Sequence, residues 1–205
     1  MSDYLTRAQL KATLQITGTA SDADVDLAIS AASRAVEEYK RLNGGRSVRF
    51  YPTVETRYYS PKWDAVTLDI DDIAGVVSVK VDRTRNFTYS ETWTAGTHFV
   101  MEPANNPLEG KPQRTLVRLP LANSFFPQNP QSVSVTGTFG WASTPYLVTE
   151  AATILAARLY QRRNAPFGIL AVGIDSGTAA RLPRTDPDVV QLLDAVDSNV
   201  PRVFA

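Results

Sequence analysis

Apolar residues recur every three to four positions along the first forty or so residues, which is the spacing of amphipathic helices. Thr6 and Gln9 have the spacing of a capping box, so a short helix is expected from there to about Ile16. A second helix is expected to begin after Ser21 and to end at the Gly44-Gly45 pair. The apolar face of this second helix comprises Val25, Ala28, Ile29, Ala32, Val36 and Tyr39. Its first turn carries three aspartates, namely Asp22, Asp24 and Asp26.

Between Val48 and Trp141 the hydrophobic period changes to two, as in half-buried strands. The segments that alternate are "VETRYYS", "AVTLDI", "GVVSVKVD", "TLVRLP" and "VSVTGTFGW". In the last of these, one face is formed by Val133, Val135, Gly137, Phe139 and Trp141. Turns rich in proline and asparagine separate the segments. About five to seven short strands spaced in this way predict an antiparallel sheet, a sandwich or a small barrel.

Helical spacing returns at Thr144, which is expected to be the N-cap with Pro145 at the first helical position. This helix is expected to run to Asn164 and is apolar around most of its circumference. Such a helix must be buried, either by its own domain or by a neighbouring subunit. A short terminal helix is expected to begin at Pro187 with Asp186 as its cap.

Helices from both ends of the chain therefore flank an inserted β region, which predicts an α+β fold. The N- and C-terminal helices are expected to pack together, with the antiparallel β region inserted between them. The expected parts are residues 1–47, 48–143 and 144–205. Within the third part, residues 168–185 are rich in glycine and small residues. We expect this linker to be flexible in the free subunit and to become ordered on assembly.

Composition narrows the possible functions. The 205 residues contain 43% hydrophobic and 20% charged residues, and 21 basic residues balance 21 acidic ones. A neutral chain has no overall field that would draw it to nucleic acid or to a membrane. The absence of cysteine excludes disulfides, thiolate nucleophiles and most structural zinc sites. The N-terminus lacks the features of a signal peptide, so a soluble, non-secreted protein without a membrane partner is expected.

Few residues are candidates for catalysis or metal binding, and no enzyme activity, cofactor or metal is expected. His98 is the single histidine and is interpreted as a structural strand residue. The acidic group Asp69, Asp71 and Asp72 could suggest a divalent metal. We interpret it instead as the end of a strand and a solvated turn, because hard-cation loops need more oxygen ligands at defined positions.

Aromatic and basic residues cluster near the start of the β region. The cluster comprises Tyr51, Tyr58, Tyr59 and Trp63 with Arg49, Arg57 and Lys62. These side chains could stack on nucleic acid or on sugar. The interpretation we favour is an aromatic sheet face with charged residues at its edge.

Charge is distributed unevenly near the C-terminus. Residues 151–185 carry five arginines and one aspartate, whereas residues 186–205 carry four aspartates and one arginine. Segments of opposite sign can pair within one chain or between copies in a ring. Arg162 and Arg163 could both stabilise the negative end of their helix and contact a partner. The predicted partner-binding residues are Arg158, Tyr160, Arg162, Arg163, Pro166, Phe167, Arg181, Arg184, Asp186 and Asp188.

The order of these features resembles the head-to-tail connector (adaptor) proteins of tailed bacteriophages, in particular the larger form found in phages of actinobacteria. "LTRAQLKATLQI" and "DLAISAASRAVEEYKRLNGGRSVRFYP" are similar to the opening helix pair of that family. "WTAGTHFVMEPANNP" resembles its mid-domain hairpin. "GWASTPYLVTEAATILAARLYQRRNAPFG" resembles its most recognisable stretch, a helix that ends in Arg-Arg-x-x-Pro-x-Gly. "RTDPDVVQLLDAV" is similar to its closing helix, whereas "VGIDSGTAARLP" departs from the family pattern.

This resemblance implies a structural role in the virion. Such proteins form a ring of about twelve copies that docks on the portal after DNA packaging. The ring extends the DNA channel, joins head to tail and contacts the next neck or tail protein. DNA would pass through without sequence-specific binding. The protein would be found in the neck of the virion, and in the host cytoplasm during assembly.

Two other functions remain open at this point. The first is a nucleic-acid-binding module that uses Arg162, Arg163 and the tyrosine-rich β region. The second is a carbohydrate-binding or hydrolytic β domain, which would need a cleft with paired carboxylates.

Overall fold

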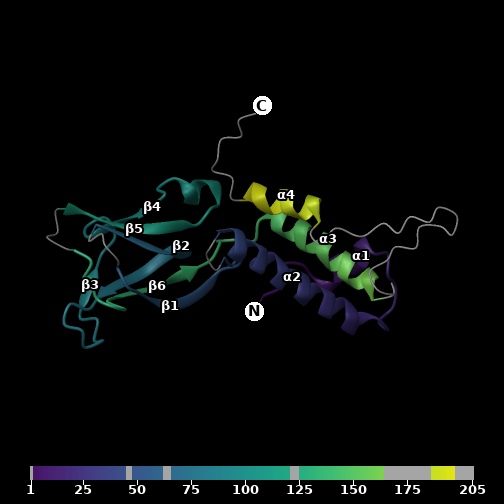
Figure 1. Cartoon of the computed structure of the whole chain (residues 1–205), viewed down its shortest axis with the longest axis horizontal. Helices are drawn as coiled ribbons and strands as arrows, with labels where there is room; N and C mark the ends of the chain where they lie inside the picture. Colours follow the sequence, from purple (N-terminus) through teal and green to yellow (C-terminus); the bar gives the residue numbers. More distant parts are fainter. Residues whose placement is uncertain (1, 45–47, 62–65, 121–124, 164–185, 197–205) are drawn as a thin grey trace, which may run out of the picture. The chain divides into compact units, whose positions relative to one another are not determined.

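A computed structural model describes residues 2–44, 48–61, 66–120, 125–163 and 186–196 (Figure 1). These residues form four α-helices and a six-stranded antiparallel sheet, so the predicted α+β class is confirmed. The chain divides into two compact units, a helical unit of residues 1–45 and 144–205 and a β unit of residues 46–143. The expected linker of residues 168–185 lies outside the described residues.

The helical unit contains α1 (Arg7–Thr13), α2 (Asp22–Gly44), α3 (Tyr146–Arg162) and α4 (Pro187–Val196). The capping box that precedes α1 is present. The Thr6 hydroxyl oxygen accepts from the Gln9 backbone N–H at 3.3 Å, and the Gln9 side chain accepts from the Thr6 N–H at 2.7 Å. The helix ends at Thr13 rather than at the expected Ile16.

Close packing of α2 on α3 forms the centre of the helical unit. Both sides of this contact are fully buried, and the α3 side consists of small residues. The buried set comprises Val25, Ala32 and Val36 of α2 and Val148, Ala151, Ala152 and Ala156 of α3. Alanines let two helix backbones approach closely. The apolar circumference of α3 is therefore covered largely within its own unit, by α2, α4 and α1.

The predicted start of α3 is wrong by one residue. Pro145, and not Thr144, is the N-cap, with φ −62° and ψ 143°, and no side chain caps the helix. The Pro145 carbonyl accepts from the N–H groups of Val148 and Thr149 at 3.0 and 3.2 Å. Proline can take this place because its fixed φ suits both the extended cap and the first helical turn.

The β unit contains β1 (Thr53–Tyr59), β2 (Thr67–Val81), β3 (Glu91–Trp93), β4 (Phe99–Glu102), β5 (Gln113–Arg118) and β6 (Val133–Phe139). The strand order is β1-β6-β2-β5-β4, and β3 pairs with β2. The sequence predicts an antiparallel sheet, a sandwich or a small barrel, and the structure has the antiparallel sheet. A short 3-10 helix, η1 (Asn106–Glu109), follows β4.

The long strand β2 corrects the interpretation of the acidic group. Two strands separated by a solvated turn were expected, but residues 67–81 form one strand with register shifts between Asp69 and Ile73 and between Ile73 and Gly75. Such bulges bend a strand without ending it. Asp72 lies in this irregular part, is only 4% exposed, and accepts from Arg114 Nε at 2.6 Å. The acidic group is thus part of the sheet, and Asp72 is structural.

One face of the sheet forms the core of the β unit. Its largest members are Phe99, Phe126 and Phe139, together with Trp93, whose ring centroid lies 4.8 Å from that of Phe126. Val133, Val135 and Phe139 face this core, as their spacing predicts. Trp141 is also buried, but it packs against Phe50 at a centroid distance of 5.7 Å.

The segment that resembles a mid-domain hairpin contributes the end of β3, all of β4 and the first part of the connection to β5. β3 pairs with β2, whereas β4 pairs with β5, and the turn at residues 94–98 connects them. His98 lies in this turn rather than in a strand. Its Nδ1 accepts from the Thr94 N–H at 3.0 Å, and its ring stacks on Trp93. These contacts of His98 stabilise the turn between β3 and β4.

Candidate interface on the helical unit

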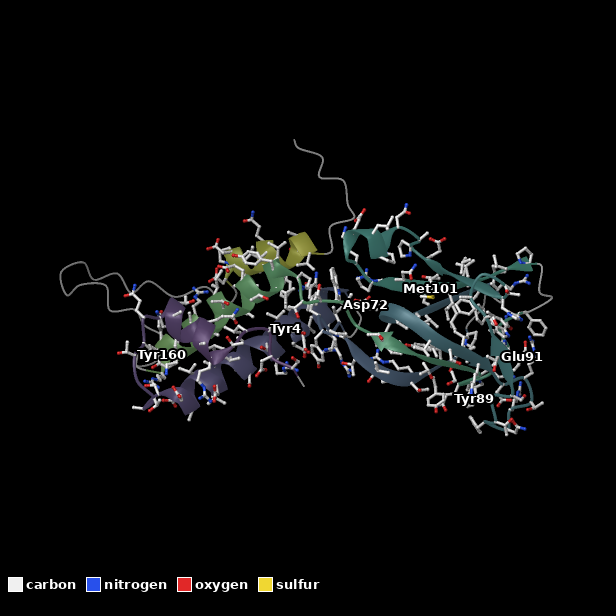
Figure 2. All side chains as sticks on the ribbon, turned by 180° about the vertical axis from the view of Figure 1, so that it is seen from behind. Tyr4, Asp72, Tyr89, Glu91, Met101 and Tyr160 are labelled. Carbon is white, nitrogen blue, oxygen red and sulfur yellow. The ribbon has the colours of Figure 1, made fainter. Side chains whose placement is uncertain are left out.

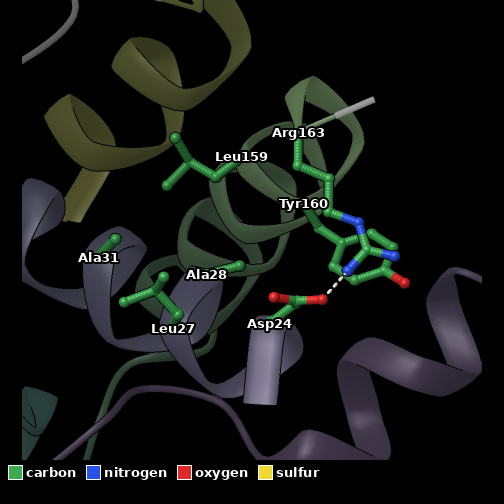
Figure 3. A pocket seen from close by; sticks show the side chains of 7 residues that line it. All are labelled: Asp24, Leu27, Ala28, Ala31, Leu159, Tyr160 and Arg163. Atoms are coloured by element: carbon green, nitrogen blue, oxygen red, sulfur yellow. Dashed lines mark hydrogen bonds and ion pairs between the residues drawn. The ribbon is translucent and has the colours of Figure 1, made fainter. Parts of the chain in front are cut away.

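An open groove lies between the N-terminal half of α2 and the C-terminal end of α3 (Figure 3). Its volume is about 240 Å³, and most of its lining is apolar. The lining residues are Asp24, Leu27, Ala28 and Ala31 of α2, with Leu159, Tyr160 and, at the C-terminus of α3, Arg163. Leu27 is 71% exposed, and Ala31 of the same lining is exposed as well. This lining makes the groove a candidate contact surface.

Arg163 closes one end of the groove. It forms an ion pair with Asp24, and its guanidinium carbon lies 4.3 Å from the centre of the Tyr160 ring (Figure 3). Both charged side chains are partly exposed, at 35% and 55%, so the pair contributes little to stability. The ion pair holds Arg163 across the groove, and the Asp24 carboxylate neutralises its charge.

Arg158 also has a partner within the chain. It forms an ion pair with Asp186 at 2.5 Å, and the Asp186 side chain accepts from the Asp188 N–H at 3.1 Å. Asp186 therefore caps α4, as the sequence predicts, and at the same time fixes the start of α4 to α3. The predicted complementarity of the two C-terminal segments is realised here inside one chain.

α4 is held on α2 and α3 by apolar and polar contacts. Leu193 is 1% exposed, and its carbonyl accepts from Lys40 Nζ at 3.0 Å. The Tyr39 hydroxyl donates to Asp194 at 2.9 Å. Burial, and secondarily the Asp194 carboxylate, raise the pKa of Tyr39, so this hydroxyl stays protonated and donating.

Two predicted site residues have no ion pair among the described residues. Arg162 is exposed at the end of α3, one helical turn beyond Arg158. Asp188 is exposed in the first turn of α4. Of the remaining predicted site residues, four lie outside the described part of the chain: Pro166, Phe167, Arg181 and Arg184.

Sequence reasoning did not identify the α2 side of the groove. Leu27 and Ala31 fall outside the apolar face that the helical period predicts for α2. A leucine on the polar side of an amphipathic helix is the signal that could have marked this surface. For Asp24, the sequence predicts only a place near the positive end of the helix.

The aromatic cluster of the β unit is not a single basic platform. Tyr58 is exposed, whereas Tyr59 lies on the opposite face of β1 and donates to Asp71 at 3.0 Å. Arg57 forms ion pairs with Glu55 and Asp71. Arg49 pairs with Glu55 at 3.2 Å, and Trp63 and Lys62 lie outside the described residues. Carboxylates therefore balance both described arginines of the cluster.

The described part of the chain contains no group of three or more histidine, aspartate and glutamate side chains that could hold a metal ion. None of its helices has the length and apolar content needed to cross a membrane.

The fold and the site together define an α+β protein with a helical unit, an inserted antiparallel sheet and an open apolar groove next to an arginine-rich helix end. No known protein family matches the sequence, and no curated protein matches it. Chains of similar fold occur among solved structures, including two of gene transfer agent particles. One is the neck of an empty gene transfer agent (GTA) particle computed with C6 symmetry, with a TM-score of 0.57 and 18% identity. The other is the virion of a native GTA particle, with a TM-score of 0.55 and 19% identity. Each match covers 94% of this chain and 88% of the other chain.

Proposed function

We propose that this chain is a structural, non-enzymatic protein of a phage-like neck. The observation that carries the proposal is the shared fold, which extends over both units of the chain and includes a chain from a GTA neck. A match over 94% of the chain covers both the helical unit and the inserted sheet, rather than one common motif. The resemblance of the sequence to phage connector proteins points to the same role.

In this proposal the chain is an adaptor that forms a ring, docks on the portal after DNA packaging and extends the DNA channel. The neighbouring GTA neck was computed with sixfold symmetry. A ring of about twelve copies is compatible with that symmetry, because heterologous contacts that close generate cyclic assemblies. The zero net charge suits a channel wall, since a strongly basic lining would retain DNA.

The proposed partners are further copies of the chain, the portal protein and the next neck or tail protein. The contact residues proposed within the described part are Arg158, Tyr160, Arg162, Arg163, Asp186 and Asp188. Arg158 and Asp186 also fix α4 in place through their ion pair. Arg162 and Asp188 carry charges that have no ion-pair partner among the described residues, and we propose that they contact a partner protein.

The test is electron microscopy of particles that contain the protein, or of the purified protein mixed with its portal. The expected result is a closed ring of copies at the portal vertex. A single copy per particle, or density elsewhere on the capsid, would contradict the proposal. In parallel, DNA binding should be measured at low and moderate salt. Affinity that falls steeply with salt would favour the nucleic-acid-binding module instead.

A further inference from the structure

The strand β1 forms an open edge of the sheet, because within the described residues it pairs with β6 alone (Figure 1). Its seven residues pair with β6 without a register shift, and none of them is a proline. On its outer face, Val54 is 73% exposed and Tyr58 is 55% exposed. Natural proteins commonly protect such an edge with prolines or bulges, because a regular edge pairs readily with another strand. β1 has neither.

The hydrogen bonds around β6 show which backbone groups of β1 point outward. The Asp82 N–H donates to the Ser132 carbonyl at 2.8 Å, so even-numbered residues along β6 face β2 and odd-numbered ones face β1. Thr56 pairs with Thr136, which is even-numbered, so the N–H and C=O of Thr56 point away from the sheet. The same alternation applies to the residues two positions before and after Thr56. Three residues of β1 therefore present backbone donors and acceptors to an incoming strand.

The edge strand β4, at the other end of the strand order, is occupied by groups of its own chain. The His98 carbonyl binds the N–H that follows β5, so by alternation the Phe99 and Met101 carbonyls point outward. The Phe99 carbonyl accepts from the Gly96 N–H at 2.8 Å. The Met101 carbonyl accepts from Gln113 Nε2 at 3.1 Å. Of these two edges, β1 is therefore the one that can accept a strand.

We propose that two copies of this chain pair through β1, in antiparallel orientation, about a twofold axis at Thr56. Three pairs of residues with two hydrogen bonds each would give roughly six backbone hydrogen bonds. On the outer face, Val54 would lie opposite Tyr58 of the second copy, and such β-branched–aromatic pairs stabilise sheets. The Tyr58 ring already packs on that of Tyr89, labelled in Figure 2, with a centroid distance of 5.4 Å. An aromatic surface is thus in place for the valine.

The two charged residues of β1 select this register. With Thr56 on the axis, each Glu55 lies opposite Arg57 of the second copy, so opposite charges face each other on both sides of the axis. A shift of two residues in one direction would put Glu55 opposite Glu55, and a shift in the other direction would put Arg57 opposite Arg57. A shift of one residue would set outward backbone groups against groups that bind β6. Charge and hydrogen bonding therefore favour the same twofold arrangement.

This pairing concerns the free protein and does not rest on the neck function. A twofold axis turns two copies to face opposite directions, whereas copies in a ring around a single axis all face the same way. The pair would have to separate before its copies enter such a ring. Until then, it would cover an edge that otherwise invites aggregation.

The first test uses the unmodified protein. Sedimentation velocity over about 5–500 µM should show a monomer–dimer equilibrium with a Kd of roughly 10–100 µM, because a single strand pair is a small interface. Over the same range, hydrogen exchange should show that the amides of Val54, Thr56 and Tyr58 gain protection as the concentration rises. The amides of Glu55 and Arg57 bind β6 and should keep the same protection throughout.

The second test places charges on the proposed axis. Thr56 is exposed, so its substitution should preserve the fold. Thr56→Lys and Thr56→Glu each set like charges against one another in the pair, and each should weaken self-association about tenfold. An equimolar mixture of the two variants sets opposite charges against one another and should restore association.

A matched pair of valine variants provides the control. Val54 and Val77 are both 73% exposed and both lie in strands, but Val77 belongs to the interior strand β2. Val54→Lys should weaken association, because it removes the aliphatic contact with Tyr58 of the second copy. Val77→Lys should associate as the unmodified protein does.

Three results would overturn the inference. One is a protein that stays monomeric over the whole concentration range. Another is self-association that both Thr56 variants retain, and the third is failure of their mixture to recover what each variant has lost. Electron microscopy tests the neck function separately. Pairing in solution without a ring on particles would leave this inference standing while the proposed function fails, and a ring with a strictly monomeric free protein would do the reverse.

Discussion

At the scale of single residues, the described part of the chain places several carboxylates where the sequence suggests solvent. Asp72 is 4% exposed, and its partner Arg114 is 33% exposed. Asp82 is 3% exposed. Its carboxylate accepts from the backbone N–H groups of Thr84, Arg85 and Phe87 at 2.7–3.1 Å. Buried carboxylates are stable only when such donors surround them, so these residues organise their surroundings.

The Asp72–Arg114 pair predicts a clear difference between two arginine substitutions. Arg114→Ala leaves a buried carboxylate without its guanidinium and should reduce the free energy of unfolding by about 2–3 kcal/mol. Arg41→Ala removes an ion pair with Glu38 in which both side chains are more than half exposed. This substitution should change the free energy of unfolding by about 0.5 kcal/mol or less. Urea unfolding of both variants measures the difference. Equal effects would show that burial of Asp72 carries no energetic consequence.

Asp82 predicts a pH dependence confined to the loop of residues 82–90. Burial alone raises the pKa of Asp82, but the N–H donors of Phe87, Thr84 and Arg85 outweigh burial, and the net pKa is lowered. A lowered folded-state pKa means that the stabilisation is complete above the ordinary value of about 3.9 and is lost as the pH falls through the lowered value.

This loop needs the support of Asp82 because Arg85, Phe87 and Tyr89 all have positive φ, between 47° and 60°, without being glycine. The protection factor of the Phe87 amide, measured by NMR from pH 6 to pH 2.5, should decrease below about pH 4 in the unmodified protein. In the Asp82→Asn variant, the protection factor of this amide should be low at every pH. A flat protection factor in the unmodified protein would refute the assignment.

At the scale of elements, close backbone approach decides how β2 and β6 pair. A Cβ built on Gly137 would lie 2.4 Å from the Gly75 carbonyl oxygen and 2.8 Å from Ile73 Cδ1. The register of β2 on β6 shifts at this place, and β2 bulges around it. The bulge and the glycine are therefore linked, because the irregular strand can approach β6 only where β6 lacks a side chain.

Two glycine substitutions test this link. Gly137→Ala should destabilise the β unit by about 1–3 kcal/mol, because either the backbone of β2 or the Ile73 side chain must move. Gly75→Ala is the control, since a Cβ there has no neighbour within 4 Å. Thermal unfolding of the two variants provides the comparison. A Gly137→Ala variant as stable as Gly75→Ala would show that the strands separate at negligible cost.

At the scale of the whole molecule, we predict that the arginines at the end of α3 matter more for assembly than for folding. Arg162 has no ion pair among the described residues, and the Arg163–Asp24 pair is partly exposed on both sides. Replacing both arginines with alanine should change the free energy of unfolding by about 1 kcal/mol or less. The same replacement should reduce portal binding or head–tail joining.

Arg158→Ala serves as the contrasting variant for this prediction. It removes the partner of Asp186, which is mostly buried, so it should loosen α4 and lower stability measurably. Unfolding curves and a portal pull-down on the three proteins separate the two roles. If the Arg162→Ala/Arg163→Ala protein unfolds while Arg158→Ala does not, the assignment of the roles is reversed.

The sequence by itself determined the class of fold and much of its local structure. Periods of 3.6 and 2 identify the helices and strands because burial on one side imposes them. The Thr6 capping box and the Asp186 cap were predictable because they depend on residues three positions apart or fewer. The same reasoning placed the arginines at the end of α3, since helix termini and charge runs are read directly from the chain.

Only the tertiary structure decided what those residues contact. Asp72 was expected in a turn because local pattern treats three aspartates as solvated, and only the bulged pairing of β2 with β5 places it beside Arg114. The pairing of β3 and β4 with different strands, the fixation of Arg158 by Asp186, and the groove between Leu27 and Leu159 likewise join residues far apart in the chain. Local propensity cannot specify these contacts, because they depend on how the elements pack in space.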